Sequence, residues 1–152
     1  MTEQLSEIDE YGGIPGQGLV RTARIPWALE AGAEARRVVV LDLSARGLGE
    51  AIIDEVELVL SELVANSLRH ASPLGDGTLR VHWKAKNDVV EIEVSDGGGQ
   101  TTPAVRRPAP WAPSGRGLRI VRSLAHEWGV VEERGMVTVW AAIGGPSRRR
   151  VN

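Results

Sequence analysis

Cysteine and phenylalanine are both absent from this chain of 152 residues. Without cysteine there can be no disulfide bond, no cysteine-ligated metal and no thiol catalysis. Three scattered histidines, His70, His82 and His126, make a poor zinc site. No apolar run approaches the roughly 20 residues that span a bilayer, and the acidic N-terminal stretch has no secretory pattern. We therefore expect a cytoplasmic protein that has no membrane partner.

A strong charge of either sign is also missing, because the formal net charge is -2. This balance gives no general attraction to nucleic acid. The five tryptophans are expected to pack in the core and the hairpins, since stacking on bases requires a basic groove. The one basic cluster, Arg148-Arg149-Arg150, is expected to be a solvated end. We predict no direct contact with nucleic acid.

The length is typical of one domain. Residues 1–17 are polar, acidic and glycine-rich, which predicts a flexible leader, and residues 145–152 predict a flexible basic tail. The domain between them, residues 18–144, alternates periodic segments with loops. The expected strands are 19–25, 78–85, 89–95, 128–132 and 137–143. The expected helices are 27–43, 50–70 and a third that begins at 115–117. The third helix is expected to face the core with Leu118, Val121, Leu124 and Ala125.

This count of elements predicts an α+β fold. We expect a two-layer α/β sandwich whose sheet is mixed but mostly antiparallel, with about three helices on one face. Two hairpins are predicted, one turned at Asn87-Asp88 and one at Arg134-Gly135. The proline- and glycine-rich stretch from Gly97 to Ser114 predicts a long loop, and loops of that length are often lids.

Glu62 and Asn66 form the first candidate pair of functional residues. They stand at positions i and i+4 of the second expected helix and so share one face near its apolar stripe. An amide oxygen is a hard neutral ligand suited to Mg²⁺, and a glutamate can accept a proton from a hydroxyl. The alternative is an ordinary solvated helix face.

Asp96 is the second candidate. Strand alternation puts it on the face of Val90, Ile92 and Val94, where a carboxylate is expensive unless it is hydrogen-bonded. An exocyclic amino group, such as that of adenine, is a suitable partner. The glycines that follow, Gly97 to Gly99, would let a flat ring approach the backbone. The alternative is an Asp-Gly turn.

The third candidate is the stretch Gly115-Arg116-Gly117-Leu118, a glycine turn that feeds a helix N-terminus. Free N–H groups and the helix dipole make such a terminus an anion site, and Arg116 adds charge. The alternative is a flexible linker. A P-loop is excluded, because no Gly-x-x-x-x-Gly-Lys-Ser/Thr sequence occurs.

In their order and context these three motifs resemble the GHKL ATPase superfamily, which includes gyrase, histidine kinases and mismatch-repair ATPases. The nearest resemblance is to bacterial anti-sigma-factor serine/threonine kinases and their short single-domain relatives. It runs from about Leu19 to Ile143 and is strongest in the segments 61–71, 115–121 and 124–130. The resemblance implies a Bergerat fold, the cofactors ATP and Mg²⁺, and a homodimer.

The resemblance also assigns roles to residues. Asn66 would match the Mg²⁺ ligand and Glu62 the general base. Asp96 would match the acid that reads adenine, and Gly98 its companion. Thr138 would match the polar residue of the last strand that supports the Asp96 contact. Gly115, Gly117 and Leu118 would match the phosphate-side glycine turn, and Arg69 and Arg116 are candidates for phosphate contacts.

These assignments predict an ATP-binding regulatory protein. As an anti-sigma factor it would bind a sigma factor and phosphorylate a serine or threonine of an antagonist protein. Two alternatives remain open from the sequence. One is a non-catalytic, nucleotide-binding regulator that only docks partners, and the other is a simple small ATPase.

Overall fold

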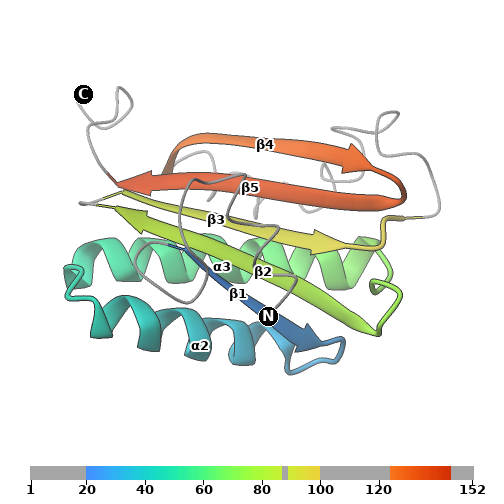
Figure 1. Ribbon diagram of the computed structural model, residues 1–152, viewed down its shortest axis with the longest axis horizontal. Helices are drawn as coiled ribbons and strands as arrows, with labels where there is room; N and C mark the ends of the chain where they lie inside the picture. The colour runs from blue at the N-terminus through green and yellow to red at the C-terminus, as the bar shows by residue number, and fades with distance from the viewer. Residues whose placement is uncertain (1–19, 87–88, 100–123, 145–152) are drawn as a thin grey trace.

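The chain is described by a computed structural model covering residues 20–86, 89–99 and 124–144. These ranges contain five strands and two helices, which are labelled in Figure 1. The strands are β1 (Val20–Pro26), β2 (Thr78–Lys86), β3 (Val89–Asp96), β4 (Ala125–Glu133) and β5 (Met136–Gly144), and the helices are α2 (Ala31–Ala45) and α3 (Glu50–His70). The bounds predicted for the second helix are confirmed at both ends.

The strands form one sheet in the order β1-β2-β3-β5-β4. Every pairing among them is antiparallel, so the part of the sheet that the structure describes is not mixed. Both predicted hairpins are present, with β2 paired to β3 and β4 to β5. The α+β sandwich is therefore confirmed. Most of the third expected helix lies outside the described residues, and Ala125, expected on its stripe, belongs to β4.

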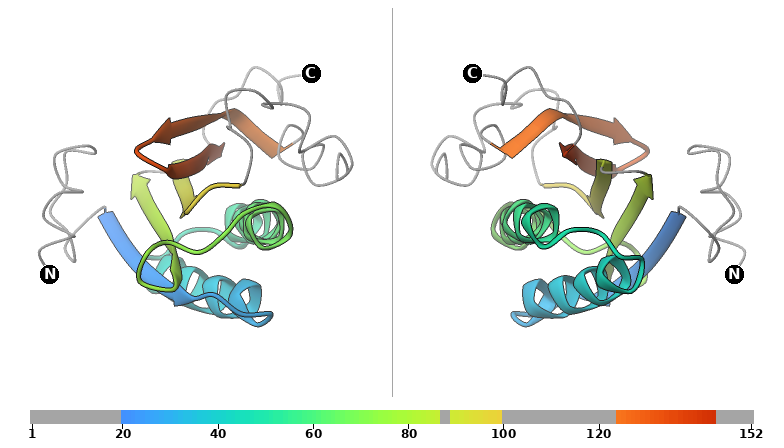
Figure 2. Two further views of the ribbon diagram at one scale, coloured as in Figure 1. Left: turned by 90° about the vertical axis from the view of Figure 1, so that its right-hand side faces the viewer. Right: turned by 90° about the vertical axis from the view of Figure 1, so that its left-hand side faces the viewer.

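Helices α2 and α3 cover the same face of the sheet, as the two end views in Figure 2 show. We call this the inner face and the opposite one the outer face. Because side chains alternate along a strand, one half of each strand faces the helices. On β2 these inner residues are Leu79, Val81, Trp83 and Ala85, and all four are buried. Arg80, His82 and Lys84 alternate onto the outer face.

The core lies between the inner face and the two helices. Helix α3 contributes a buried stripe at the spacing of three and four residues, made of Ile53, Val56, Val59, Leu60, Leu63 and Val64. Ile52 and Leu68, two further apolar residues of α3, are only partly buried. The stripe fixes the rotation of α3 and with it the direction of the polar residues near its C-terminal end.

Helix α2 begins at Ala31, four residues later than predicted. The backbone N–H of Trp27, just after β1, donates to the carbonyl of Gly77, just before β2. This hydrogen bond holds the residues after β1 in a turn next to the start of β2. Asp42, near the other end of α2, anchors the helix to the sheet. It accepts hydrogen bonds from Trp83 Nε1 at 2.8 Å and from Arg21 Nε at 3.2 Å.

Candidate functional site

Asp96 ends β3 on the inner face, where the sequence alternation predicts it. Its register partner on β5 is Val137, and its next inward neighbour on β3 is Val94. The side chain is 4% exposed. A carboxylate in such surroundings is unfavourable unless other groups compensate for the lost water. The site is therefore defined by what Asp96 contacts.

Two donors from different elements hold the Asp96 carboxylate. Ser67 Oγ of α3 donates to Oδ2 at 2.6 Å, and the backbone N–H of Gly98 donates to Oδ1 at 2.8 Å. Burial raises the pKa of Asp96, and these two hydrogen bonds offset part of that rise. Each carboxylate oxygen has two lone-pair sites, so one protein donor per oxygen leaves capacity for a further donor.

The segment after Asp96 is fastened to the loop that follows α3. Gly97 N donates to Ser72 O at 2.8 Å, while Ser72 donates to Gly98 O through its N–H at 3.0 Å and its Oγ at 2.8 Å. A Cβ on Gly97 would lie 2.2 Å from the carbonyl oxygen of Pro73, so only glycine fits there. Gly98 has a φ of 85°, a conformation that glycine adopts readily.

Asn66 and Glu62 occupy the face of α3 that adjoins this site. Asn66 directly precedes Ser67 and is 1% exposed. Its Oδ1 lies 3.3 Å from Arg69 Nη2, so Arg69 donates to the predicted Mg²⁺ ligand. Glu62, one turn earlier, is half-buried. The helix thus places the predicted base and metal ligand on one face. Ser67, the next residue of the same helix, contacts Asp96.

Basic residues end α3 beside the glycine segment. Arg69 and His70 lie in its last turn, where cations are favoured by the helix dipole. Burial and then the neighbouring Arg69 lower the pKa of His70. The His70 carbonyl oxygen would lie 3.0 Å from a Cβ on Gly99, so the two backbones pass close to each other.

Thr138 of β5 is the residue that we expected to support the Asp96 contact. Its Oγ1 lies 2.7 Å from Ser95 Oγ, and the two residues form a register pair on the outer face. Neighbouring residues of a strand point to opposite faces, so a side chain paired with Ser95 cannot also face Asp96. The residue of β5 that faces Asp96 is Val137.

The predicted phosphate-side residues Gly115, Arg116, Gly117 and Leu118 lie outside the described residues. The structure therefore brings together the helix motif and the strand-end motif. It does so through Ser67, which the sequence reasoning missed. A signal for it exists, because Ser67 continues the apolar stripe at three residues after Val64 and four after Leu63. A hydroxyl on a core stripe indicates a buried polar partner.

The described residues contain no cluster of three or more His, Asp or Glu side chains that could hold a metal ion by themselves. In the same ranges no helix is both long and apolar enough to cross a membrane.

Comparisons with known proteins bear on the family and the fold. A sequence model of the histidine kinase-like ATPase domain matches residues 25–142. The chain has no match among curated proteins. Two solved structures share the fold at low sequence identity. The RsbU and RsbW domains of Rv1364c from Mycobacterium tuberculosis give a TM-score of 0.61 at 18% identity, over 85% of this chain and 34% of that chain.

The second structure is the SiaB-SiaC complex from Pseudomonas aeruginosa, with a TM-score of 0.61 at 13% identity, over 93% of this chain and 98% of the other. This chain spans about a third of the Rv1364c chain and nearly all of the matched chain of the complex. The family match covers most of the sequence and includes Glu62, Asn66, Ser67 and Asp96. This protein therefore belongs to the family of histidine kinase-like ATPase domains.

Proposed function

We propose that this protein binds ATP with Mg²⁺ and transfers the terminal phosphoryl group to a serine or threonine of an antagonist protein, while acting as an anti-sigma factor. The observation that carries the nucleotide site is the buried Asp96, held by Ser67 and Gly98 next to the buried Asn66. Such an acid destabilises a fold, so its position is best explained by a ligand that it binds.

Adenine is the ligand group that suits Asp96. Its exocyclic amino group is a donor, and the Asp96 oxygens keep acceptor capacity beyond Ser67 and Gly98. The glycines at positions 97 and 98 carry no side chains that would hold a flat ring away from the backbone. Replacing the carboxylate by an amide would present an N–H group where an acceptor is needed.

Mg²⁺ fits the residues only together with a nucleotide. Asn66 offers one hard amide oxygen, and the described residues hold no acidic cluster that would bind the ion alone. Magnesium is commonly held by one or two protein oxygens plus phosphates and water. We assign Asn66 as the protein ligand. The ion supplies charge neutralisation at the phosphates when it is bound.

Glu62 is the proposed base. It lies on the Asn66 face of α3, one turn away. In the proposed transfer, the hydroxyl oxygen of the protein substrate forms a bond to the γ-phosphorus. The bond from that phosphorus to the β–γ bridging oxygen breaks, ADP leaves with the electron pair, and Glu62 accepts the hydroxyl proton. Arg69 and the glycine turn at 115–117 are proposed to contact the phosphates.

The partner assignment rests on the sequence resemblance to anti-sigma-factor kinases. The SiaB-SiaC complex, which shares the fold, shows a protein with this architecture bound to a second protein. We propose a sigma factor and an antagonist as the two partners, and a homodimer as the assembly.

Thermal unfolding of the wild type and of single variants in rising ATP·Mg²⁺ tests the site. A ligand that binds the native state raises the melting temperature by mass action. We expect a rise for the wild type and none for Asp96→Asn. The matched control is Asp76→Asn, which makes the same change at an exposed acid and should retain the full rise.

Transfer of labelled phosphate to a candidate antagonist tests the chemistry. Glu62→Gln should bind ATP with wild-type affinity and lose about 10²- to 10⁴-fold in transfer rate, the usual contribution of a general base. Unchanged transfer by Glu62→Gln would remove that role from Glu62. Wild-type ATP binding without transfer or hydrolysis would select the docking regulator, and hydrolysis that needs no protein partner would select the small ATPase.

A further inference from the structure

His82 is buried on a face of the sheet where the described residues provide no second layer. Both helices pack against the inner face (Figure 2), whereas His82 alternates onto the outer face, which Figure 1 views from the front. The His82 side chain is nevertheless 1% exposed. Neighbouring side chains on a sheet shield the sides of a residue from solvent. The end of its side chain stays exposed to solvent unless another segment covers that face.

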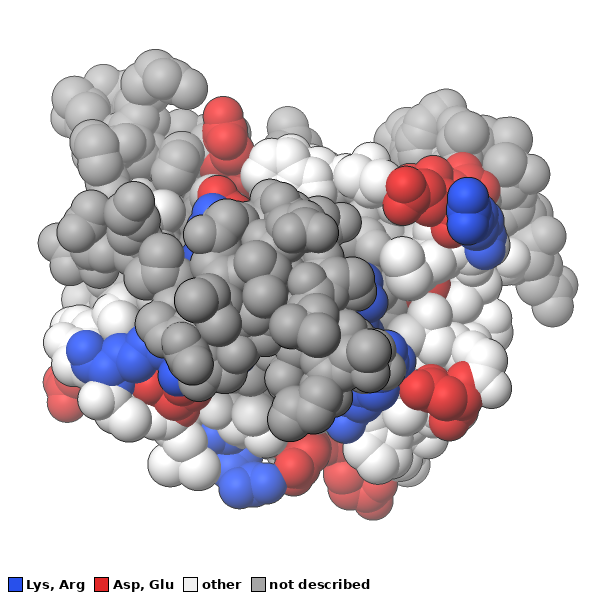
Figure 3. Space-filling view, in the orientation of Figure 1, with Lys and Arg blue, Asp and Glu red and all other residues white. Residues whose placement is uncertain are grey.

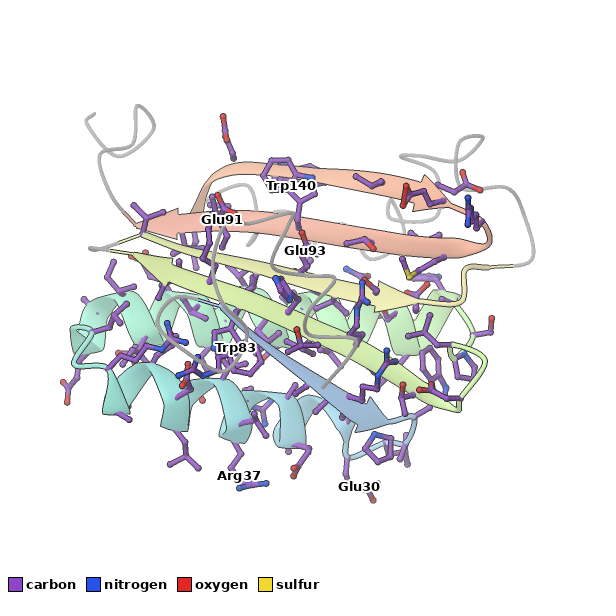
Figure 4. The ribbon with its side chains drawn as sticks, viewed as in Figure 1. Glu30, Arg37, Trp83, Glu91, Glu93 and Trp140 are labelled. Atoms are coloured by element: carbon purple, nitrogen blue, oxygen red, sulfur yellow. The ribbon has the colours of Figure 1, made fainter. Side chains whose placement is uncertain are left out.

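The register identifies the neighbours of His82 in the row that crosses the sheet. The row runs Thr22, His82, Glu93, Trp140 and Gly129, from β1 to β4. Trp140 covers the far end, because a Cβ on Gly129 would lie 2.8 Å from the Trp140 indole nitrogen. At the near end Thr22 Oγ1 lies 2.8 Å from His82 Nδ1. Figure 4 places Trp140 and Glu93 on their separate strands along this face.

Positive charge gathers on the β1-β2 side of the outer face. Arg24 and Arg80 are direct cross-strand partners, and Lys84 follows on the same side of β2. Like charges in direct opposition destabilise a sheet, so negative charge near Arg24 and Arg80 is favoured. Asp76 supplies part of it, 3.1 Å from Arg24, and Glu91 lies 3.7 Å from Lys84. Figure 3 shows Lys and Arg side chains around the middle of this face.

The segments outside the described ranges differ sharply in charge. Residues 100–123 contain five arginines and residues 145–152 contain three, and neither segment has an acidic residue. Residues 1–19 contain no lysine or arginine and four acids, namely Glu3, Glu7, Asp9 and Glu10. They also contain Leu5, Ile8, Tyr11 and Ile14, which are suited to cover an imidazole. Of these three segments, residues 1–19 alone complement the basic side of the outer face.

We propose that residues 1–19 lie over the outer face, with their acids against Arg24 and Arg80 and their apolar side chains over His82. The attachment point favours this arrangement, because residue 19 precedes Val20, the first residue of β1, next to β2. Neighbouring strands are about 4.8 Å apart and an extended residue spans about 3.3 Å, so a few residues suffice to reach His82. The outer face is then an interaction surface occupied by the protein's own acidic segment.

Hydrogen–deuterium exchange of the full chain tests this placement. Amides in residues 1–19 should exchange about tenfold more slowly than in a free peptide of the same sequence, because covered backbone is protected. Arg80→Glu should return them to the free-peptide rate. Arg37→Glu is the matched control, since it makes the same charge change on α2, where Arg37 points away from the sheet (Figure 4). It should leave the protection intact.

A second variant keeps the test valid if Arg80→Glu disturbs the sheet. Glu7→Lys combined with Glu10→Lys changes only the segment, and it should remove the protection by itself. Adding Arg80→Glu to that double variant should restore it. Free-peptide exchange in the wild type, or equal effects of Arg80→Glu and Arg37→Glu, would overturn the proposal. Protection that disappears on dilution would assign the cover to a second copy and would also overturn it.

Discussion

Ser67 and Asp96 are 29 residues apart in the chain, and the Ser67 hydroxyl donates to the Asp96 carboxylate across 2.6 Å. This contact fastens the C-terminal half of α3 to the end of β3. It also links the two halves of the proposed ATP site, since Ser67 directly follows Asn66. A change in the position of α3 would therefore move both the residue proposed to bind Mg²⁺ and the residue proposed to bind adenine.

Ser67→Ala should lower the free energy of unfolding by about 1–3 kcal/mol, because it leaves the buried Asp96 with one donor fewer. It should also weaken ATP binding, since the carboxylate loses a positioning contact. Urea unfolding at pH 7 and calorimetric titration with ATP·Mg²⁺ measure the two effects. Ser61→Ala makes the same change on α3, where the hydroxyl donates to the Glu57 carbonyl. Equal stability losses in the two variants would contradict the importance of the Ser67 contact.

Asp96→Asn should abolish ATP binding and leave the free energy of unfolding at pH 7 equal to that of the wild type or higher. Burial raises the pKa of Asp96 in the folded protein above the ordinary value of 3.8. The folded state therefore binds the Asp96 proton more tightly than the unfolded state does. Wild-type stability consequently falls as the pH rises from 3.8 through the pKa of Asp96 in the folded protein. The advantage of the variant should consequently shrink toward pH 4. Urea unfolding of both proteins between pH 4 and pH 7 measures the difference in their free energies of unfolding. A difference that favours the variant less at pH 7 than at pH 4 would contradict the prediction.

Gly97→Ala should destabilise the protein and weaken nucleotide binding together. The new Cβ would meet the backbone carbonyl oxygen of Pro73 at 2.2 Å, and a backbone atom cannot move aside as a flexible side chain can. We expect a loss of about 1–3 kcal/mol, typical of overpacking. Gly75→Ala is the control on the loop after α3 that Gly97 approaches, because a Cβ there meets nothing within 4 Å. Wild-type thermal stability in Gly97→Ala would show that the Asp96 segment is not held as described.

His82→Gln should flatten the dependence of stability on pH below neutrality. Burial, followed by Arg80 and Lys84, lowers the pKa of His82 from 6.5 to about 4. The unfolded chain therefore takes up a proton first, and wild-type stability falls as the pH drops from 6.5 toward about 4. The full difference for one group shifted this far is about 3 kcal/mol. Urea unfolding at several pH values compares the two proteins, and the contribution of Asp96 cancels because both contain it. Parallel profiles would contradict the burial of a neutral His82.

The sequence by itself determined most of the elements. The bounds of α3 follow from the apolar stripe of Val56, Leu60 and Leu63 and from Gly49 before it, and β2 and β3 follow from strict alternation. Alternation also put Asp96 on the inner face. These are local properties, because the 3.6- and 2-residue periods decide which side chains share a face before any partner is present.

The hydrogen-bond partners and the burial of individual side chains were decided only by the tertiary structure. Alternation could say that Asp96 points inward, but its donor Ser67 comes from a helix 29 residues away. Alternation likewise put His82 on the face away from the helices and left its burial unexplained. The same holds for Thr138, whose hydroxyl meets Ser95 because the register of β3 and β5 pairs them. Hydrogen bonds and burial depend on which surfaces meet in space, and the period of a segment carries no information about the surface that it will meet.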